Sequence, residues 1–495
     1  IDVDGDGRLD VVTLGGDLFL QKKDGSFRHT ALEWPKRQAS FGAGDLDGDG
    51  LPELVTTGGE QWKDNRSFLF PRTLLRNLGG GKFKSVAEKA AFRRPVYGRS
   101  AVFADFDDDG DADLFLGNYR LAANELFVND KGALTDQAAA RGCRGVGRRH
   151  ENSPEYFGHT IGASWADLDD DGWIDLWVSN LVHKYYGPSA RGSGFDVRGK
   201  ICDDSNLYRN TGPPDFRFVD RRKESGIAIK PVGGRDAYRG DELWSNCACA
   251  DFDNDGDLDV FVTQVYTLPY SHSFLFRNEG GFRFKEADAG FRIFAGYGGA
   301  WADVDGDGRM DLVTGGALNE PKAPRQVRLW RNKTRGGAWI AFRLPPGALG
   351  AVVRVLTDTK VLTRTVEATM GSHAQKNDDL LHFGLGEESV KEVWISWPGG
   401  VLQRKTAVAP KRVHKLKRPA ARPRALSLEV GGTEIVCKPA LAGARYLWDF
   451  DDDFRTDAVT KENHVSLPEG HASKSVCVRV LKGTVGGWAR ARVGE

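Results

Sequence analysis

A nine-residue acidic pattern recurs six times along the chain, as Asp-x-Asp-x-Asp-Gly-x-x-Asp or a close variant. Loops 1 to 6 begin, in chain order, at Asp2, Asp45, Asp105, Asp167, Asp251 and Asp303. Four carboxylates within nine residues repel one another, and a hard divalent cation with oxygen ligands relieves this repulsion. Glycine at position 6 permits the sharp backbone turn that brings the carboxylates together. The pattern therefore predicts about six calcium sites.

The predicted ligands are the carboxylates at positions 1, 3, 5 and 9 and the backbone carbonyl at position 7. The last ligand of loop 2 is a glutamate, whose longer side chain still reaches the ion. In order of position, the six predicted sets are Asp2, Asp4, Asp6, Arg8 and Asp10; Asp45, Asp47, Asp49, Leu51 and Glu53; Asp105, Asp107, Asp109, Asp111 and Asp113; Asp167, Asp169, Asp171, Trp173 and Asp175; Asp251, Asp253, Asp255, Asp257 and Asp259; and Asp303, Asp305, Asp307, Arg309 and Asp311.

An EF-hand begins with the same spacing but requires glutamate at position 12 and a helix on each side. Position 12 is never acidic in this chain: it is Thr13, Thr56, Leu116, Val178, Val262 and Thr314. The residues on both sides of the loops are rich in valine, phenylalanine, tryptophan and leucine, which favour strands. The loops are therefore predicted to join antiparallel strands.

A second motif, Leu-aromatic-x-Asn, follows the loops at Leu126–Asn129, Leu207–Asn210, Leu275–Asn278 and Leu329–Asn332, with Leu74–Asn77 close and Leu18–Gln21 a weaker copy. Repetition at this scale indicates a repeat architecture. Together the two motifs resemble FG-GAP or VCBS repeats over about residues 1–335. The resemblance implies an all-β fold with a β-propeller of four-stranded, calcium-bound blades. Seven blades are favoured and six remain open, and sequence is expected upstream of Ile1 to supply the missing first strand.

Residues 336–418 change to alternating apolar and polar residues, as in half-buried strands. Three motifs occur in order, Gly350–Val355, Leu381–Gly386 and Trp397–Gly400. They resemble the ASPIC/UnbV domain, which implies a small β domain after the propeller. His382 is expected to be a packed strand histidine rather than a catalytic base or metal ligand. Residues 419–424 are predicted to be a basic linker.

Residues 425–495 contain Cys437, Trp448 and Cys477 in the order typical of an immunoglobulin-like sandwich, which predicts a disulfide between the two cysteines. Tyr446–Asp453 resembles the core motif of PKD domains. Asp449 and the acidic residues after it imitate a seventh calcium loop, but Phe454 occupies the glycine position and no metal is predicted there. The pairing of Cys143, Cys202, Cys247 and Cys249 is left open.

The composition suits a turn-rich β protein, with 61 glycines and 13 tryptophans. Acidic and basic residues balance at 69 each, so the metal-loaded chain should be net positive. No run of 18 apolar residues predicts a membrane helix. Calcium sites of this type favour an exported protein at the cell surface or outside the cell. Arg239–Asp241 is an RGD tripeptide and Asn65 and Asn332 begin glycosylation sequons, and we interpret all three as chance matches.

No nucleophile elbow, zinc-protease motif or phosphate-binding loop occurs, so we expect no enzyme activity. The leading hypothesis is a calcium-stabilised extracellular adhesion or ligand-binding scaffold with a protein or polysaccharide partner. The alternative is a structural subunit of a surface filament, layer or larger complex that assembles with itself. A third hypothesis is a hydrolase or lyase that uses the propeller channel. The basic linker lacks interleaved aromatic residues, so no nucleic-acid partner is expected.

Overall fold

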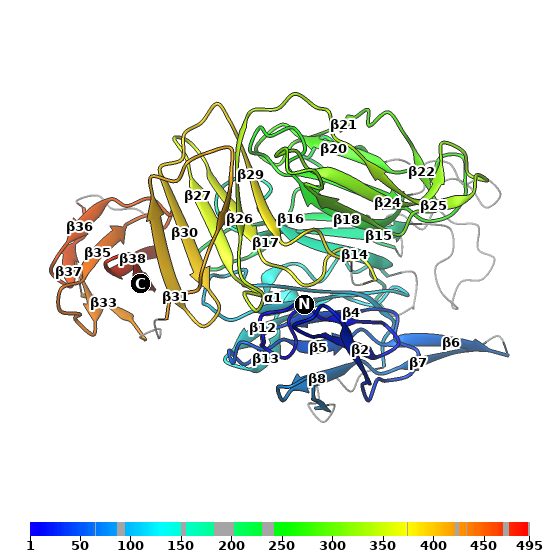
Figure 1. The fold of residues 1–495 in the computed structure, drawn as a ribbon, viewed down its shortest axis with the longest axis horizontal. Helices are drawn as coiled ribbons and strands as arrows, with labels where there is room; N and C mark the ends of the chain where they lie inside the picture. Colours follow the sequence, from blue (N-terminus) through cyan, green and yellow to red (C-terminus); the bar gives the residue numbers. More distant parts are fainter. Residues whose placement is uncertain are drawn as a thin grey trace.

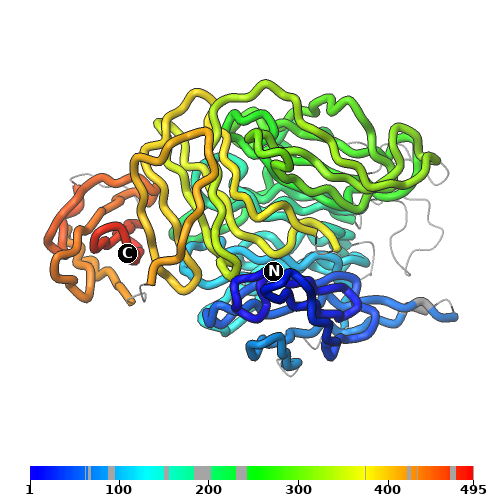
Figure 2. Tube along the Cα trace, viewed as in Figure 1, coloured from blue at the N-terminus to red at the C-terminus, as the bar shows by residue number. Residues whose placement is uncertain are grey.

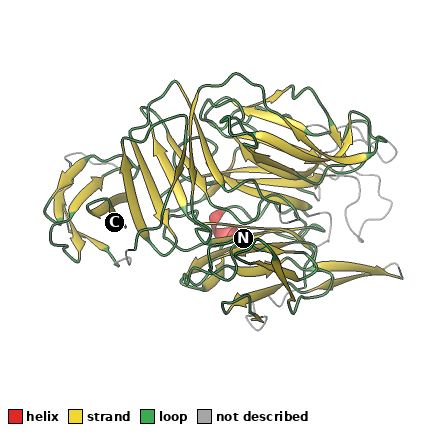
Figure 3. Cartoon of the chain, in the orientation of Figure 1, coloured by secondary structure: helices red, strands yellow, loops and turns green. Residues whose placement is uncertain are grey.

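The computed structural model describes residues 1–64, 66–86, 95–149, 155–182, 202–229, 242–373, 375–420, 425–431, 433–468 and 475–493. Within these residues nearly all regular structure is β, and the four-residue α1 (Ala138–Arg141) is the one α-helix (Figure 3). The prediction of an all-β fold is therefore confirmed. No helix in the described ranges is long and apolar enough to cross a bilayer.

The first two thirds of the chain form six successive antiparallel groups of strands, which we call blades 1 to 6 (Figure 1). Blade 1 contains β1 (Val11–Val12), β2 (Asp17–Gln21) and β3 (Phe27–Ala31). Blade 2 contains β4 (Phe41–Gly44), β5 (Glu53–Thr56), β8 (Thr73–Asn77) and β9 (Phe83–Ser85), with a projecting ribbon of β6 (Gly59–Lys63) and β7 (Arg66–Phe70). Blade 3 contains β10 (Gly98–Ala104), β11 (Asp113–Asn118), β12 (Glu125–Asp130) and β13 (Ala133–Asp136).

Blades 4 and 5 join through β15 and β18 into one eight-stranded sheet. Blade 4 contains β14 (Thr160–Ala166), β15 (Asp175–Val182), β16 (Asn206–Asn210) and β17 (Phe218–Asp220). Blade 5 contains β18 (Glu242–Ala250), β19 (Asp259–Gln264), β20 (Phe274–Asn278) and β21 (Phe284–Ala287). Blade 6 contains β22 (Ile293–Phe294), β23 (Gly299–Ala302), β24 (Asp311–Leu318) and β25 (Arg325–Trp330). Closure of the ring with a seventh blade stays a prediction.

The strands that lead into loops 2 to 6 lie next to one another, in the order β4, β10, β14, β18 and β23. Close approach requires small residues here: a Cβ added to Gly44 would lie 2.4 Å from the ring of Phe103 in the next blade. The second strands are covered on both faces, and β11 is buried along its whole length. This double burial explains why these strands appear in the sequence as continuous apolar runs rather than as alternating patterns.

A segment of the ASPIC/UnbV-like region, residues 366–373 and 375–379, lies along the first strands of blades 3 to 5, and we call it the axial segment. Gly371 and Ala163 exchange two backbone hydrogen bonds, of 2.6 and 3.1 Å. The hydroxyl of Thr369 donates to the carbonyl of Ala101 at 2.8 Å, and Asn377 donates to the carbonyl of Cys249 at 3.0 Å. The axial segment therefore contacts the first strands of blades 3, 4 and 5. In Figure 2 it is the yellow tube between the blue blades and the green blades.

The ASPIC/UnbV-like region consists of two sheets that enclose one apolar core. One sheet contains β26 (Ala338–Arg343), β29 (Leu380–Gly386) and β32 (Val413–Lys415). The other contains β27 (Val352–Leu356), β28 (Val361–Thr365), β30 (Glu392–Trp397) and β31 (Val401–Thr406). Strand β31 also pairs with β39 near the end of the chain, so the second sheet continues into the C-terminal region. The domain boundaries themselves stay predictions.

The C-terminal region is a sandwich of two sheets around Trp448 and Cys437. One sheet contains β33 (Ser427–Gly431), β34 (Glu434–Lys438) and β37 (His464–Ser466). The other contains β35 (Arg445–Asp449), β36 (Ala458–Thr460), β38 (Ser475–Lys482) and β39 (Val485–Arg492).

The predicted disulfide between Cys437 and Cys477 is not formed, because both thiols are free and buried. Alternation along β38 explains the error. Val476 and Val478 face the sandwich core that contains Cys437, so the side chain of Cys477 between them faces the opposite side of the sheet. The two cysteines occur in the order expected for an immunoglobulin-like disulfide. However, Cys477 is one residue out of register along β38, which places its side chain on the side of the sheet that faces away from Cys437.

Candidate calcium centres

Loops 2 to 6 lie at hairpins between strands, as predicted from the sequence. Loops 2 to 5 join the first and second strands of blades 2 to 5, loop 6 joins β23 to β24, and loop 1 precedes β1. None of these described loops has a flanking helix, which excludes an EF-hand arrangement. The five predicted ligand positions of each loop therefore lie in the same place relative to the strand that follows the loop.

The backbone of each loop forms the same cradle of hydrogen bonds. The N–H of the glycine at position 6 donates to the carboxylate at position 1, at 2.9–3.3 Å in all six loops. The N–H at position 7 donates to the carboxylate at position 5, at 2.8–3.0 Å. The glycine adopts φ between 81° and 104°, which explains the requirement for glycine. Backbone N–H groups of each loop thus orient the carboxylates at positions 1 and 5.

Ligand oxygens converge in these cradles. Within five loops, one oxygen from each of three acidic residues lies within 4.8 Å of the others, in the sets Asp2, Asp4 and Asp6; Asp45, Asp47 and Glu53; Asp105, Asp107 and Asp113; Asp167, Asp169 and Asp175; and Asp251, Asp253 and Asp255.

Several of these carboxylate oxygens have no hydrogen-bond donor in the structure. They are Oδ1 atoms of Asp47, Asp107, Asp167, Asp169, Asp251 and Asp253. Asp167 and Asp251 are each only 1% exposed. A buried, unpartnered carboxylate oxygen is costly, and coordination of a cation would compensate that cost. The donor set, all oxygen and mostly anionic, fits calcium.

Arginines from the blades neutralise part of this charge. Arg76 pairs with Asp47 at 2.7 Å, and Arg209 pairs with Asp171 at 2.6 Å. Arg331 contacts Asp305 in the same way. All three occupy the variable position of Leu-aromatic-x-Asn, or of the closely related Leu74–Asn77. The second motif therefore supplies a cation to the ligands at positions 3 and 5.

Burial raises the pKa of many loop carboxylates, and neighbouring carboxylates raise it further. The pKa of Asp45 and Asp255 rises to about 6, and that of Glu53 and Asp251 rises to about 7. The pKa values of Asp105, Asp113, Asp167, Asp175 and Asp259 lie well above the ordinary value for the same reasons. Without an added cation, the buried loops therefore favour the protonated form.

The C-terminal half of the chain docks on loops 3, 4 and 5 through position 4. The residues there are Asp108, Asp170 and Asn254, all with positive φ. Their backbone carbonyls accept hydrogen bonds from Trp488 Nε1 at 3.0 Å, the Val361 N–H at 3.2 Å and the Gly386 N–H at 2.8 Å. Each of these three donors belongs to the region after residue 350.

Buried basic side chains strengthen this docking. Arg354 donates to the carboxylate of Asp108 at 2.9 Å, and its guanidinium lies 4.2 Å from the ring centroid of Phe454. Lys360 Nζ lies 3.1 Å from Asp170 and also contacts Asp257. Asp108 and Asp170 are not predicted ligands, and Asp257 is predicted to bind through its backbone carbonyl rather than its carboxylate, so these contacts leave the predicted ligand atoms free. These basic residues were not predicted from the sequence; the signal for them was the replacement of glycine at position 4.

The acidic sequence that starts at Asp449 folds like a calcium loop. Its position-5 N–H donates to Asp449 at 3.1 Å, and the Phe450 N–H donates to Asp457 at 2.6 Å. However, Arg479 donates to Asp449 Oδ2 at 3.0 Å. A guanidinium thus approaches the carboxylate oxygen that, at position 1 of loops 1 to 6, accepts the glycine N–H. This arrangement agrees with the prediction that no metal binds here.

His382 is buried, and its Nε2 lies 3.1 Å from the carbonyl of Gly308. Burial lowers its pKa to about 4. This environment is that of a packed neutral histidine. Asn65 and the tripeptide at residues 239–241 lie outside the described residues. The side-chain nitrogen of Asn332 bonds two backbone carbonyls.

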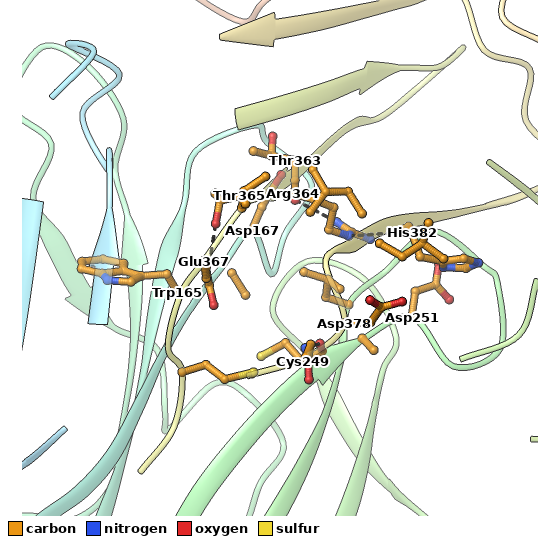
Figure 4. Close-up of a pocket in the computed structure, with 18 of the residues that line it drawn as sticks. Trp165, Asp167, Cys249, Asp251, Thr363, Arg364, Thr365, Glu367, Asp378 and His382 are labelled. Atoms are coloured by element: carbon orange, nitrogen blue, oxygen red, sulfur yellow. Dashed lines mark hydrogen bonds between the residues drawn. The ribbon is translucent and has the colours of Figure 1, made fainter. Parts of the chain in front are cut away.

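A cavity of about 100 Å³ remains between the propeller and the axial segment (Figure 4). Its walls include Trp165, Asp167, Cys249 and Asp251 from the propeller and Arg364, Glu367 and His382 from the ASPIC/UnbV-like region. Burial raises the pKa of Glu367 to about 8. Ligand pockets typically measure about 300–1,000 Å³. The cavity is therefore smaller than a site for a sugar chain requires.

Comparison with protein families agrees with this architecture. The FG-GAP-like repeat family matches residues 2–56 and 251–314, and the ASPIC and UnbV family matches residues 344–423. The chain thus carries FG-GAP-like repeats followed by an ASPIC/UnbV domain.

The chain is homologous to cartilage acidic protein 1. It is 25% identical to the Mus musculus protein over 333 residues, which covers 64% of this chain and 44% of that protein. It is also 25% identical to the Homo sapiens protein over 333 residues, which covers 64% and 43%. The chain therefore spans less than half the length of these relatives.

Two solved structures share parts of the architecture. An Agrocybe aegerita lectin that recognises non-reducing terminal N-acetylglucosamine has a TM-score of 0.35 and 16% identity, over 66% of this chain and 76% of the lectin. Rhamnogalacturonan lyase YesW has a TM-score of 0.33 and 16% identity, over 76% of this chain and 65% of the lyase. Similarity at this level carries no conclusion about function.

Proposed function

We propose that this protein is a non-catalytic, calcium-binding extracellular scaffold for adhesion or ligand binding. The observation that carries the proposal is the repeated cradle: six loops orient their carboxylates identically, and buried ligand oxygens in four of them lack a donor. Bound calcium would supply the missing positive charge and stabilise each hairpin. Folding and ion binding would then be one linked equilibrium.

A calcium titration followed by native mass spectrometry tests the calcium part. About six ions should bind the wild-type protein at millimolar calcium, and magnesium should bind more weakly because it requires near-octahedral geometry and loses its bound water reluctantly. Asp303→Asn should lower the number by one. Asp288→Asn, at an exposed turn outside the loops, is the matched control and should leave it unchanged. Absence of bound calcium in the wild-type protein would reject the proposal.

A protein or polysaccharide at the cell surface is the proposed partner. The axial segment and the small cavity leave little space for a substrate along the axis, which favours a binding role over a hydrolase or lyase. Glycan arrays and pull-downs with calcium and with chelator test this role. Partner binding that requires calcium supports it, whereas turnover of a polysaccharide by a pure sample would overturn it.

A structural subunit is the second candidate, and strand β25 favours it. Among the described strands, β25 pairs with β24 alone, and Val327 and Leu329 on it are 79% and 49% exposed. An exposed edge with apolar residues is suited to pairing with another chain. Light scattering with and without calcium distinguishes the candidates: ordered assembly supports the subunit, and a stable monomer supports the scaffold.

A further inference from the structure

The asparagine of the second motif makes the same contacts in blades 2 to 6. Its backbone N–H donates to the carboxylate at position 9 of its own loop, at 2.7–3.2 Å. Its side-chain Oδ1 accepts a backbone N–H two or three residues later in the chain. The five residues are Asn77, Asn129, Asn210, Asn278 and Asn332.

The side-chain nitrogen of each asparagine bridges two loops. It donates to the carbonyl at position 8 of its own loop, at 3.0–3.2 Å. It also donates to the carbonyl at position 2 of the loop in the preceding blade, at 2.6–3.0 Å. Asn210, for example, joins Ile174 of loop 4 to Phe106 of loop 3.

The peptide at position 2 completes the connection. Its N–H donates to the carboxylate at position 9 of its own loop in all six loops, at 2.8–3.3 Å. Each position-9 carboxylate is therefore linked through the backbone of one residue, at position 2, and one asparagine to the position-9 carboxylate of the next loop. The links form a continuous hydrogen-bonded relay from Asp10 in loop 1 to Asp311 in loop 6.

The asparagine amide supplies the groups that this position requires. Its two N–H donors and its acceptor act at once on three different backbone groups, and glutamine, which carries the same amide, is longer by one methylene. Aspartate would place another negative charge beside the loops and lose both donors. Four of the five asparagines are at most 2% exposed, so water cannot replace their contacts. Gln21, at the equivalent place in blade 1, keeps the N–H bond to Asp10 at 2.8 Å.

We propose that these five asparagines couple neighbouring calcium sites, so that the ions bind with positive cooperativity. The proposal builds on the proposed calcium sites. An ion in one loop fixes its position-9 carboxylate and the peptide at position 2, which in turn fixes the asparagine of the next blade. The asparagine then orients the position-9 ligand of its own loop before the next ion arrives. The entropy lost in ordering these groups is then lost when the first ion binds. It therefore does not reduce the affinity for the second ion.

Native mass spectrometry at rising calcium concentration tests the coupling directly, because it resolves each number of bound ions. Coupled sites should give mainly empty and fully loaded protein, with intermediate species scarce at half-saturation. Independent sites would give a binomial distribution centred on three ions. Absence of binding rejects the calcium sites themselves, whereas binomial binding rejects only the relay.

Asn210→Ala cuts the relay between loops 3 and 4. Species with about half of the ions should then accumulate, and the coupling across this point should fall by about tenfold, within the usual range of coupling between sites. Asn118→Ala is the matched control. Asn118 is also a buried asparagine, but it lies at the end of β11 that is farther from loop 3 and takes no part in the relay. Both variants lose a buried amide, but only the first should create intermediates.

Asn332→Ala keeps the test valid if Asn210→Ala fails to fold, because Asn332 is only partly buried. It should separate loop 6 alone, so that species with one ion fewer than full loading accumulate. Hydrogen exchange in calcium locates the loop with delayed protection, which should be residues 303–311. A wild-type distribution in Asn332→Ala would overturn the proposal.

Discussion

Loops 3 to 5 and loops 1, 2 and 6 share one motif but have different surroundings. Glycine occupies position 4 in loops 1, 2 and 6, and a Cβ added to Gly48 or Gly306 would meet no atom within 4 Å. In loops 3 to 5 this position carries Asp108, Asp170 or Asn254, whose carbonyls bind the C-terminal half of the chain. Position 4 of the same acidic motif is thus an exposed glycine in one group of loops and a docking residue in the other.

Within each of loops 3 to 5, the residues that are predicted to bind the ion are different from the residue that contacts the C-terminal region. Positions 1, 3, 5 and 9 face the predicted ion, while position 4 faces the neighbouring region. Because position 4 is not a ligand, the docking surface arises without loss of a calcium site. The cost is a non-glycine residue in the left-handed region, which aspartate and asparagine tolerate better than other residues.

Calcium removal should have the largest effect. One site at a hundredfold excess of calcium over its Kd contributes about 2.7 kcal/mol of stability, so the loss of several sites exceeds any single substitution. Hydrogen exchange should show β27 and β28 losing protection together with loops 3 to 5 after chelation. Strands β33 and β34, which lie away from the loops, are the internal control. Unchanged protection of β27 and β28 would show that docking does not depend on the ion.

The pH dependence of the ion-free protein should be the next largest effect. Burial raises the pKa of Asp251 and Asp171 to about 7, above the ordinary value near 3.8. Between pH 4 and 7 the native state therefore holds more protons than the unfolded state, and the free energy of unfolding falls as pH rises. The total loss should reach several kcal/mol, on the order of 1.4 kcal/mol per pH unit for each group.

Chemical denaturation in chelator at pH 5 and pH 7.5 measures this loss. Asp251→Asn, which cannot ionise, should make the stability less dependent on pH. Saturating calcium should reverse the sign, because the ion binds the carboxylate form. A stability that rises with pH in chelator would contradict the assigned environment of these loops.

Arg354→Ala should cost up to about 3–5 kcal/mol, because it removes the arginine that donates to buried Asp108 and leaves that carboxylate the more distant guanidinium of Arg490, at 3.6 Å. Arg354→Met keeps part of the packing against Phe454 and should remain nearly as costly if the charge pair dominates. Arg331→Ala is the matched control on exposed loop 6, where the arginine is 51% exposed, and should cost under about 1 kcal/mol. Denaturation at saturating calcium measures all three. Equal costs for Arg354→Ala and Arg331→Ala would remove the distinction between the two groups of loops.

The sequence was sufficient to predict features that depend on local spacing. The six acidic loops and the strands beside them follow from nearby residues, and the structure contains them. The boundary near residue 336 was also placed from nearby residues and stays a prediction. The position-6 glycines were interpreted correctly because a backbone requirement leaves a direct signal in residue type.

Long-range contacts left weaker signals. The asparagine of Leu-aromatic-x-Asn was recognised as a marker, but its bond to the preceding blade needs the ring to be assembled. The docking of Arg354 on Asp108 spans 246 residues, and no local pattern predicts it. The cysteine pairing failed for a different reason: the side on which Cys477 lies depends on a strand register of one residue.

Gly306→Asp should have the smallest effect and gives the most specific test of position 4. Gly306 has φ of 74°, so aspartate there costs about 1 kcal/mol of backbone strain. The substitution should add no stabilising contact, because an added Cβ meets no neighbouring atom that could act as a docking partner. Gly306→Val is the control for strain alone and should cost more, because branched residues avoid this region. If Gly306→Asp instead stabilised the calcium-loaded protein, aspartate at position 4 would stabilise the loop itself. The presence of Asp108 and Asp170 at this position would then no longer indicate docking.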